Sequence, residues 1–84
     1  MTFESINENI EVISYFAVDR MRPLRFRWRE RVYHISSVQG VWSNPVGANR
    51  YIHYHVTTRQ SGTCELVYDL QKMHWILARV CLDG

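Results

Sequence analysis

The sequence lacks the features that mark membrane and secreted proteins. No stretch approaches the roughly 20 apolar residues that a membrane-spanning helix needs. No segment combines a basic start, an apolar run and a small-residue cleavage site, so a secretory signal is not expected. The two cysteines, Cys64 and Cys81, are too few for a metal cage of their own. We expect them to be reduced thiols in a cytoplasmic protein with no membrane association.

Motifs for catalysis and cofactor binding are also lacking. The sequence contains no phosphate-binding loop, no dinucleotide fingerprint and no glycine-rich elbow around a serine. Cys64 falls on the apolar face of its segment, which predicts a buried and unreactive thiol. The sequence therefore predicts a protein that is not an enzyme and that uses no cofactor.

What is present is typical of one small globular domain. The 84 residues leave room for a single core, and 46% of them are apolar and 13% aromatic. Residues 1–8 are interpreted as an acidic N-terminal segment and residues 9–84 as a single β domain.

Helical periodicity is weak, while apolar and polar residues alternate repeatedly, as in half-buried strands. The alternation predicts six strands at residues 9–19, 24–29, 32–38, 50–58, 64–70 and 73–82, with a loop at residues 43–49. A change of phase at Ser36 and Ser37 predicts a β-bulge. We predict an all-β fold, a small antiparallel meander of about six strands rolled into a barrel-like sheet.

Turn signals between these segments predict how the strands pair. A three-residue loop ending at Gly62, a turn at residues 71–72 and a turn at residues 30–31 each join two apolar alternations. The expected cross-strand pairs are Trp28 with Tyr33, Phe26 with Ile35, Val56 with Leu66, Tyr54 with Tyr68, Tyr68 with Trp75, and Leu66 with Leu77.

The aromatic residues recur in short motifs along residues 9–83. In chain order the residues of these motifs, aromatic and other, are Pro23, Phe26 and Trp28; Tyr33 and Ile35; Trp42; Tyr54 and Val56; Glu65, Leu66, Tyr68 and Asp69; Trp75 and Leu77. This order resembles a bacterial family of short all-β domains of unknown function, members of which also form C-terminal pieces of some Y-family-polymerase-like proteins. The resemblance implies a small all-β fold, a cytoplasmic location and no known activity. Where the family pattern has a glycine after Trp28, this chain has Glu30, which leaves the turn type open.

Charge is distributed unevenly along the first third of the chain. Residues 1–19 contain four acidic residues and no basic one, whereas residues 20–31 contain six arginines and one glutamate. The alternation places Arg25, Arg27 and Arg29 on one face of a strand, with Arg22 and Arg31 just beyond its two ends, and these five residues form a predicted arginine stripe. Such a row is a candidate contact for the phosphates of a nucleic acid or another polyanion. Because the net charge is only +2, we favour exposed arginines, at least one of which meets an N-terminal carboxylate.

The predicted pairing also places His53, Asp69 and His74 in one row. On a different hairpin it places His34 opposite Arg27 of the stripe. A carboxylate between two imidazoles is a weak candidate for a transition-metal site. No supporting polar residues accompany the row, so ordinary cross-strand polar pairs are favoured and no metal is predicted.

Trp42 and Tyr51 lie outside the apolar alternation and are candidate anchors for a partner. The favoured function is a non-catalytic interaction module that binds a protein in the bacterial cytoplasm. The alternative is a nucleic-acid-binding module that uses the arginine stripe, and a metal-binding or enzymatic role ranks third. A monomer is favoured over a homodimer, because the first strand is apolar on both faces and is expected to be covered within the sheet.

Overall fold

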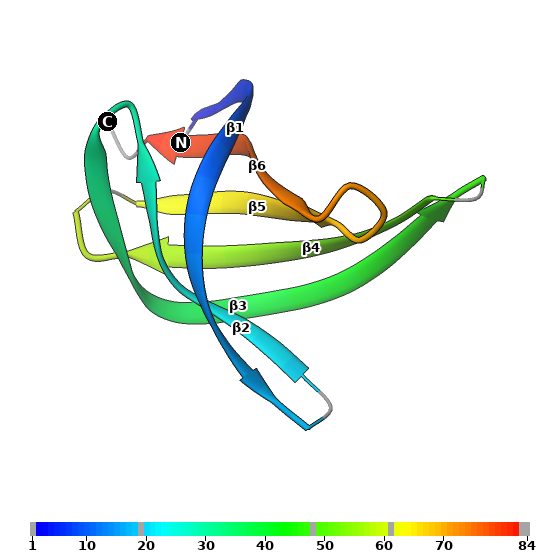
Figure 1. Cartoon of the computed structure of the whole chain (residues 1–84). Coiled ribbons are helices and arrows are strands. Elements are labelled where there is room, and N and C mark those ends of the chain that lie inside the picture. Colours follow the sequence, from blue (N-terminus) through cyan, green and yellow to red (C-terminus); the bar gives the residue numbers. More distant parts are fainter. Residues whose placement is uncertain (1, 19, 48, 61, 83–84) are drawn as a thin grey trace.

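The computed structural model describes residues 2–18, 20–47, 49–60 and 62–82 (Figure 1). Its strands are β1 (Thr2–Ala17), β2 (Arg20–Trp28), β3 (Arg31–Val46), β4 (Asn49–Thr58), β5 (Thr63–Asp69) and β6 (His74–Leu82). Each strand is antiparallel to the next, and β6 pairs with β1, so the sheet closes into a ring. The predicted all-β, barrel-like meander is confirmed. The described residues include no helix that could cross a membrane.

The first strand is longer than predicted. Residues 2–8, interpreted as a segment preceding the β domain, form the first half of β1 and pair with β6. The pairing is interrupted between Ser5 and Glu8, where Asn7 has a φ of 54°. This bulge interrupts the two-residue alternation, which explains why the pattern did not predict a strand here.

The apolar core fills the inside of the ring. Phe26 of β2, Tyr54 of β4, Leu66 of β5 and Leu77 of β6 are each at most 2% exposed. Burying a side chain of this size contributes about 1.5–3 kcal/mol. Trp75 is buried and its ring lies 4.9 Å from that of Tyr68, between centroids. The core thus lies on the faces of β4, β5 and β6 that the alternation predicts to point inward. The exceptions are Leu70 and Met73, which were predicted to point inward but lie in the β5–β6 turn and are exposed.

In residues 24–29 the alternation places Leu24 on the same face as Phe26 and Trp28, which predicts that it points inward, and this is wrong. Ile13 pairs with Arg25 and Ser14 with Pro23, so Leu24 is the extra residue of a bulge in β2. Its side chain is 40% exposed. Because the bulge shifts the alternation of β2 by one residue, Pro23 and Phe26 are both buried although they are three residues apart.

The turn between β2 and β3 occupies Arg29 and Glu30, one residue earlier than predicted. Both have positive φ angles, 51° and 66°, as in a two-residue type I′ hairpin. The register is therefore shifted by two residues, and Phe26 pairs with Tyr33 instead of Ile35. A shift of two keeps every side chain on its predicted face.

The β4–β5 loop also closes one residue early, with the Thr58 N–H donating to the Gly62 carbonyl over 3.1 Å. Val56 consequently pairs with Cys64, and Tyr54 with Leu66. Between β5 and β6 the predicted pairs are confirmed: Tyr68 lies opposite Trp75 and Leu66 opposite Leu77.

Strand β3 changes neighbours along its length. Residues 31–34 pair with β2, and from Ile35 to Val46 the strand pairs with β4. The pairing with β4 shifts between Ile35 and Ser37, as the predicted bulge requires, and again between Val38 and Gly40. Residues 43–46, predicted as loop, continue β3. The β1–β2 and β3–β4 hairpins therefore diverge from the ring in different directions (Figure 1).

Candidate functional site

All five residues of the arginine stripe are exposed, as predicted. The Nε atom of Arg27 donates to Glu11 over 3.2 Å, and Nη2 of Arg29 donates to Glu8 over 2.7 Å. The predicted contact between the stripe and N-terminal carboxylates is therefore confirmed. Both carboxylates belong to β1, so strand pairing, and not a loose acidic segment, brings them to the arginines.

Glu8 also accepts a hydrogen bond of 2.8 Å from the indole nitrogen of Trp28. The Arg29 guanidinium lies over the Trp28 ring, 4.5 Å from its centroid. Hydrogen bonds from Arg29 and then from Trp28 lower the pKa of the Glu8 carboxyl below its usual value. Arg29 thus helps to stabilise the strained turn to which it belongs, and its guanidinium is less available to a ligand.

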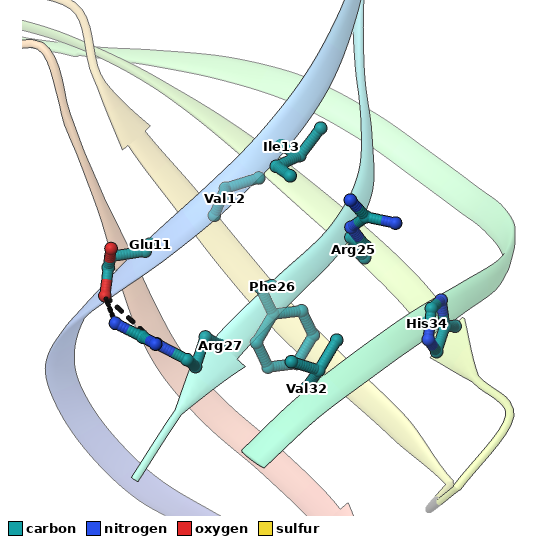
Figure 2. Close-up of a pocket in the computed structure, with 8 residues that line it drawn as sticks. All are labelled: Glu11, Val12, Ile13, Arg25, Phe26, Arg27, Val32 and His34. Carbon is teal, nitrogen blue, oxygen red and sulfur yellow. Dashed lines mark hydrogen bonds and ion pairs between the residues drawn. The ribbon is translucent and has the colours of Figure 1, made fainter. Parts of the chain in front are cut away.

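Arg25 and Arg27 of the stripe border a hollow of about 590 Å³ on the outer surface of β1, β2 and β3 (Figure 2). Arg25 and His34 are direct cross-strand partners, which corrects the predicted pairing of His34 with Arg27. The ion pair of Glu11 and Arg27 lies at the opposite side of the hollow, beyond Phe26 (Figure 2). Among the described residues, Arg25 has no ion-pair partner.

Of the two candidate anchors, Trp42 is the accessible one. Its ring stacks on the His53 imidazole, with centroids 5.2 Å apart and planes 7° from parallel. Trp42 nevertheless stays 43% exposed, whereas Tyr51 is partly buried and lies opposite Asp69. The stacking fixes the orientation of the Trp42 ring on the outer surface of β3. This side chain would therefore lose little conformational entropy when a partner binds it.

The predicted histidine–aspartate row does not form. His53 lies opposite Val67, and its Nδ1 is 3.3 Å from a Glu65 oxygen. Asp69 is 3% exposed and accepts hydrogen bonds from the backbone N–H groups of the β5–β6 turn, which is a structural role. His74 pairs with Asp69 as predicted, over 3.9 Å. No group of three or more possible metal ligands occurs in the described part of the chain.

A second hollow, missed by the sequence reasoning, lies where β2 and β3 separate. This hairpin cleft has a volume of about 500 Å³ and is lined by Arg20, Met21, Arg22, Val38, Val41, Ile52 and Tyr54. The Tyr54 hydroxyl donates a 2.9 Å hydrogen bond to the backbone carbonyl of Met21, linking β4 to β2 across it. Val41 pairs with the core residue Tyr54 and yet is 56% exposed.

The sequence does contain a signal for this cleft. Val38 and Val41 continue the apolar inner face of β3 only if two bulges intervene. A β3 strand that includes them extends well beyond the residues that pair with β2. Bulge positions depend on the neighbouring strand, so the alternation alone did not predict the separation.

Comparison of the chain with protein-family models, with curated proteins and with solved structures gives no significant match. The resemblance to the family of short bacterial domains stays a prediction from the sequence motifs. The two hollows and the residues around them are therefore the features that can indicate a function.

Proposed function

We propose that this chain is a non-catalytic interaction module that binds a protein partner through the hairpin cleft. The observation that carries the proposal is the exposure of side chains on the inner face of the sheet. Val41 is 56% exposed and Phe16, which pairs with the cleft residue Met21, is 70% exposed. Apolar side chains of this kind, rimmed by polar residues, are typical of sites that a partner covers.

The proposal includes a cytoplasmic location in a bacterium. Cys64 and Cys81 are buried free thiols, in keeping with a reducing compartment, and the sequence motifs resemble bacterial domains. Burial, with a smaller contribution from Cys81, raises the pKa of the Cys64 thiol to about 11, which makes it a poor nucleophile at neutral pH. A catalytic role therefore has no support from this cysteine.

A nucleic-acid partner is the second candidate, and the pair of Arg25 and His34 favours it. Against it, Glu11 and Glu8 already neutralise two arginines of the stripe, and phosphate binding depends on cations that can replace counterions. The stripe thus offers an interrupted positive surface, whereas the hairpin cleft offers a mainly apolar one whose lining also includes Arg20 and Arg22.

Site-specific photocrosslinking in the source cells tests the proposal. A photoreactive residue replaces Val41 in the cleft or, as the matched control, Val32 in the hollow beside Arg25. Both valines lie on β3 and are about half exposed. We expect a discrete protein adduct from position 41 that is lost when Phe16→Asp is added. A nuclease-sensitive adduct from position 32 alone would favour nucleic acid, and no adduct from position 41 would overturn the proposal.

A further inference from the structure

The hairpin cleft lies between two strand edges that lack a neighbour. In the described residues, β2 and β3 pair only as far as Arg25 and His34. Beyond that point β2 pairs with β1 alone, and β3 pairs with β4 alone. Unpaired edges of this kind are templates for an added strand, because their N–H and C=O groups point away from the existing sheet.

The edge of β2 is a poor template. Pro23 has no N–H to donate, and Leu24 is the extra residue of a bulge. The Met21 carbonyl already accepts the hydrogen bond from the Tyr54 hydroxyl. These three features block regular pairing along the first half of β2.

The edge of β3 is a good template. Residues 40–44 pair with β4 in unbroken register, so this stretch is regular and extended. This stretch begins at Gly40. A Cβ added at Gly40 would lie 3.8 Å from the Trp42 ring, which is an ordinary van der Waals contact. In a strand added along β3, the side chains on the inner face of the sheet would lie beside Val41. Those on the outer face would lie beside Trp42.

The lining of the cleft specifies the added strand. Met21, Val38, Val41 and Ile52 require apolar side chains on its inner face. Both charged residues of the described lining, Arg20 and Arg22, are cationic, so carboxylates are the complementary charges. An alternating apolar and acidic segment fits both requirements.

We infer that the hairpin cleft binds an extended, apolar and acidic peptide segment of the partner protein, which adds as a strand along residues 40–44 of β3. The inference rests on the proposed function and specifies how the partner is held. Main-chain hydrogen bonds to β3 provide affinity, and the cleft selects the side chains.

The test uses fluorescence anisotropy with the intact protein and a labelled peptide of about nine residues, in which valine alternates with threonine and glutamate. A second peptide of identical sequence carries N-methyl groups on two central amides. Each main-chain hydrogen bond contributes about 0.5–1.5 kcal/mol, so we expect N-methylation to weaken binding about tenfold or more. A third peptide has lysine in place of glutamate and should bind more weakly still at low salt.

Matched variants locate the site. Val41→Asp and Arg22→Glu should abolish or strongly weaken peptide binding, whereas Val32→Asp and Arg25→Glu, on the same two strands but outside the cleft, should leave it intact. Circular dichroism of each variant shows whether the fold is retained.

Several results would overturn the inference. They are no binding of the first peptide, equal binding of the N-methylated peptide, or a wild-type dimer that Val41→Asp converts to a monomer. Competition by oligothymidylate together with loss of binding in Arg25→Glu would do the same. A crosslinked partner at position 41 without peptide binding would reject only strand addition. Peptide binding without any crosslinked partner would instead reject the proposed function.

Discussion

Trp28 donates its indole N–H to the carboxylate of Glu8 over 2.8 Å, joining β2 to β1 beside a turn of strained backbone. Arg29 at the first turn position donates to the same carboxylate. One ionised side chain therefore satisfies two donors and holds the end of the β2–β3 hairpin in place. The hairpin geometry is thus coupled to the ionisation of Glu8.

Replacing Glu8 with glutamine is expected to flatten the acid limb of the stability profile. The Glu8 pKa is lowered in the folded protein from 4.5, first by Arg29 and then by Trp28. A lowered folded-state pKa means that the stabilisation is complete above 4.5 and is lost as the pH falls through the folded-state value. Urea unfolding from about pH 6 to about pH 3, across the range in which the carboxyl titrates, measures this. Equal acid sensitivity in wild type and Glu8→Gln would refute the coupling; Glu4→Gln is the control.

The substitution Glu30→Gly is expected to stabilise the protein by about 1 kcal/mol. Glu30 has a φ of 66°, where a side chain costs roughly 1–2 kcal/mol and glycine costs little, although glycine also gains entropy in the unfolded chain. Arg29→Gly relieves similar strain at 51° but loses the contacts with Glu8 and Trp28, so it should not stabilise. Chemical denaturation of both variants checks this contrast, and a destabilised Glu30→Gly protein would show that the turn geometry is wrong.

Alternation predicted the faces of the strands better than it predicted their partners. Side chains such as Phe26 and Leu66 are buried as expected, because a register shifted by two residues leaves each side chain on its face. The turns were placed one residue late at Glu30 and Gly62. For the β2–β3 turn the reason is that Arg29 and Glu30 have positive φ angles, and non-glycine residues at positive φ follow no simple sequence signal.

The candidate site was harder to predict than the fold. The arginine stripe follows from local sequence alone, and its contacts with β1 follow from neighbouring strands. The hairpin cleft depends on where β3 leaves β2, and that depends on bulges at residues 35–40 of β3 and at Leu24 of β2. A bulge that changes a strand's direction is set by packing across the whole ring, which short sequence patterns do not encode.

Both cysteines should resist alkylation in the native protein. Cys64 and Cys81 are each 2% exposed, and the pKa of the Cys64 thiol is raised to about 11, mainly by burial. Near pH 8 the thiolate fraction of Cys64 is therefore very small, and access is blocked as well. Mass spectrometry after iodoacetamide treatment should find labelling only as denaturant unfolds the chain. Rapid native labelling of Cys64 would contradict the assigned inner face of β5.

Deletion of residues 1–8 is expected to unfold most of the protein. Residues 2–5 and Glu8 pair with β6, so their removal leaves β1 paired with β6 only at Asn9 and Ile10 and weakens the closure of the ring. A domain of this size has only about 5–10 kcal/mol of stability, and an exposed apolar edge also promotes association. Circular dichroism and sedimentation check this expectation. A truncated protein that melts like wild type would show that the β1–β6 pairing is dispensable.

Releasing Arg27 from Glu11 is expected to strengthen weak polyanion binding. An exposed ion pair contributes about 0.2–1 kcal/mol, so Glu11→Gln should raise affinity for oligothymidylate by a factor of about 1.4 to 5 at low salt. The gain should disappear at high salt, because screening weakens every contact of this kind. Arg25→Glu should strongly weaken the binding, since Arg25, like Arg22 and Arg31, has no ion-pair partner among the described residues, and it borders the hollow together with Arg27. Fluorescence anisotropy at two salt concentrations measures these effects, with Arg59→Glu as a control that makes the same charge change outside the stripe. If Arg25→Glu and Arg59→Glu behave alike, the stripe is only a solvated face of β2, and the nucleic-acid alternative loses its single supporting observation.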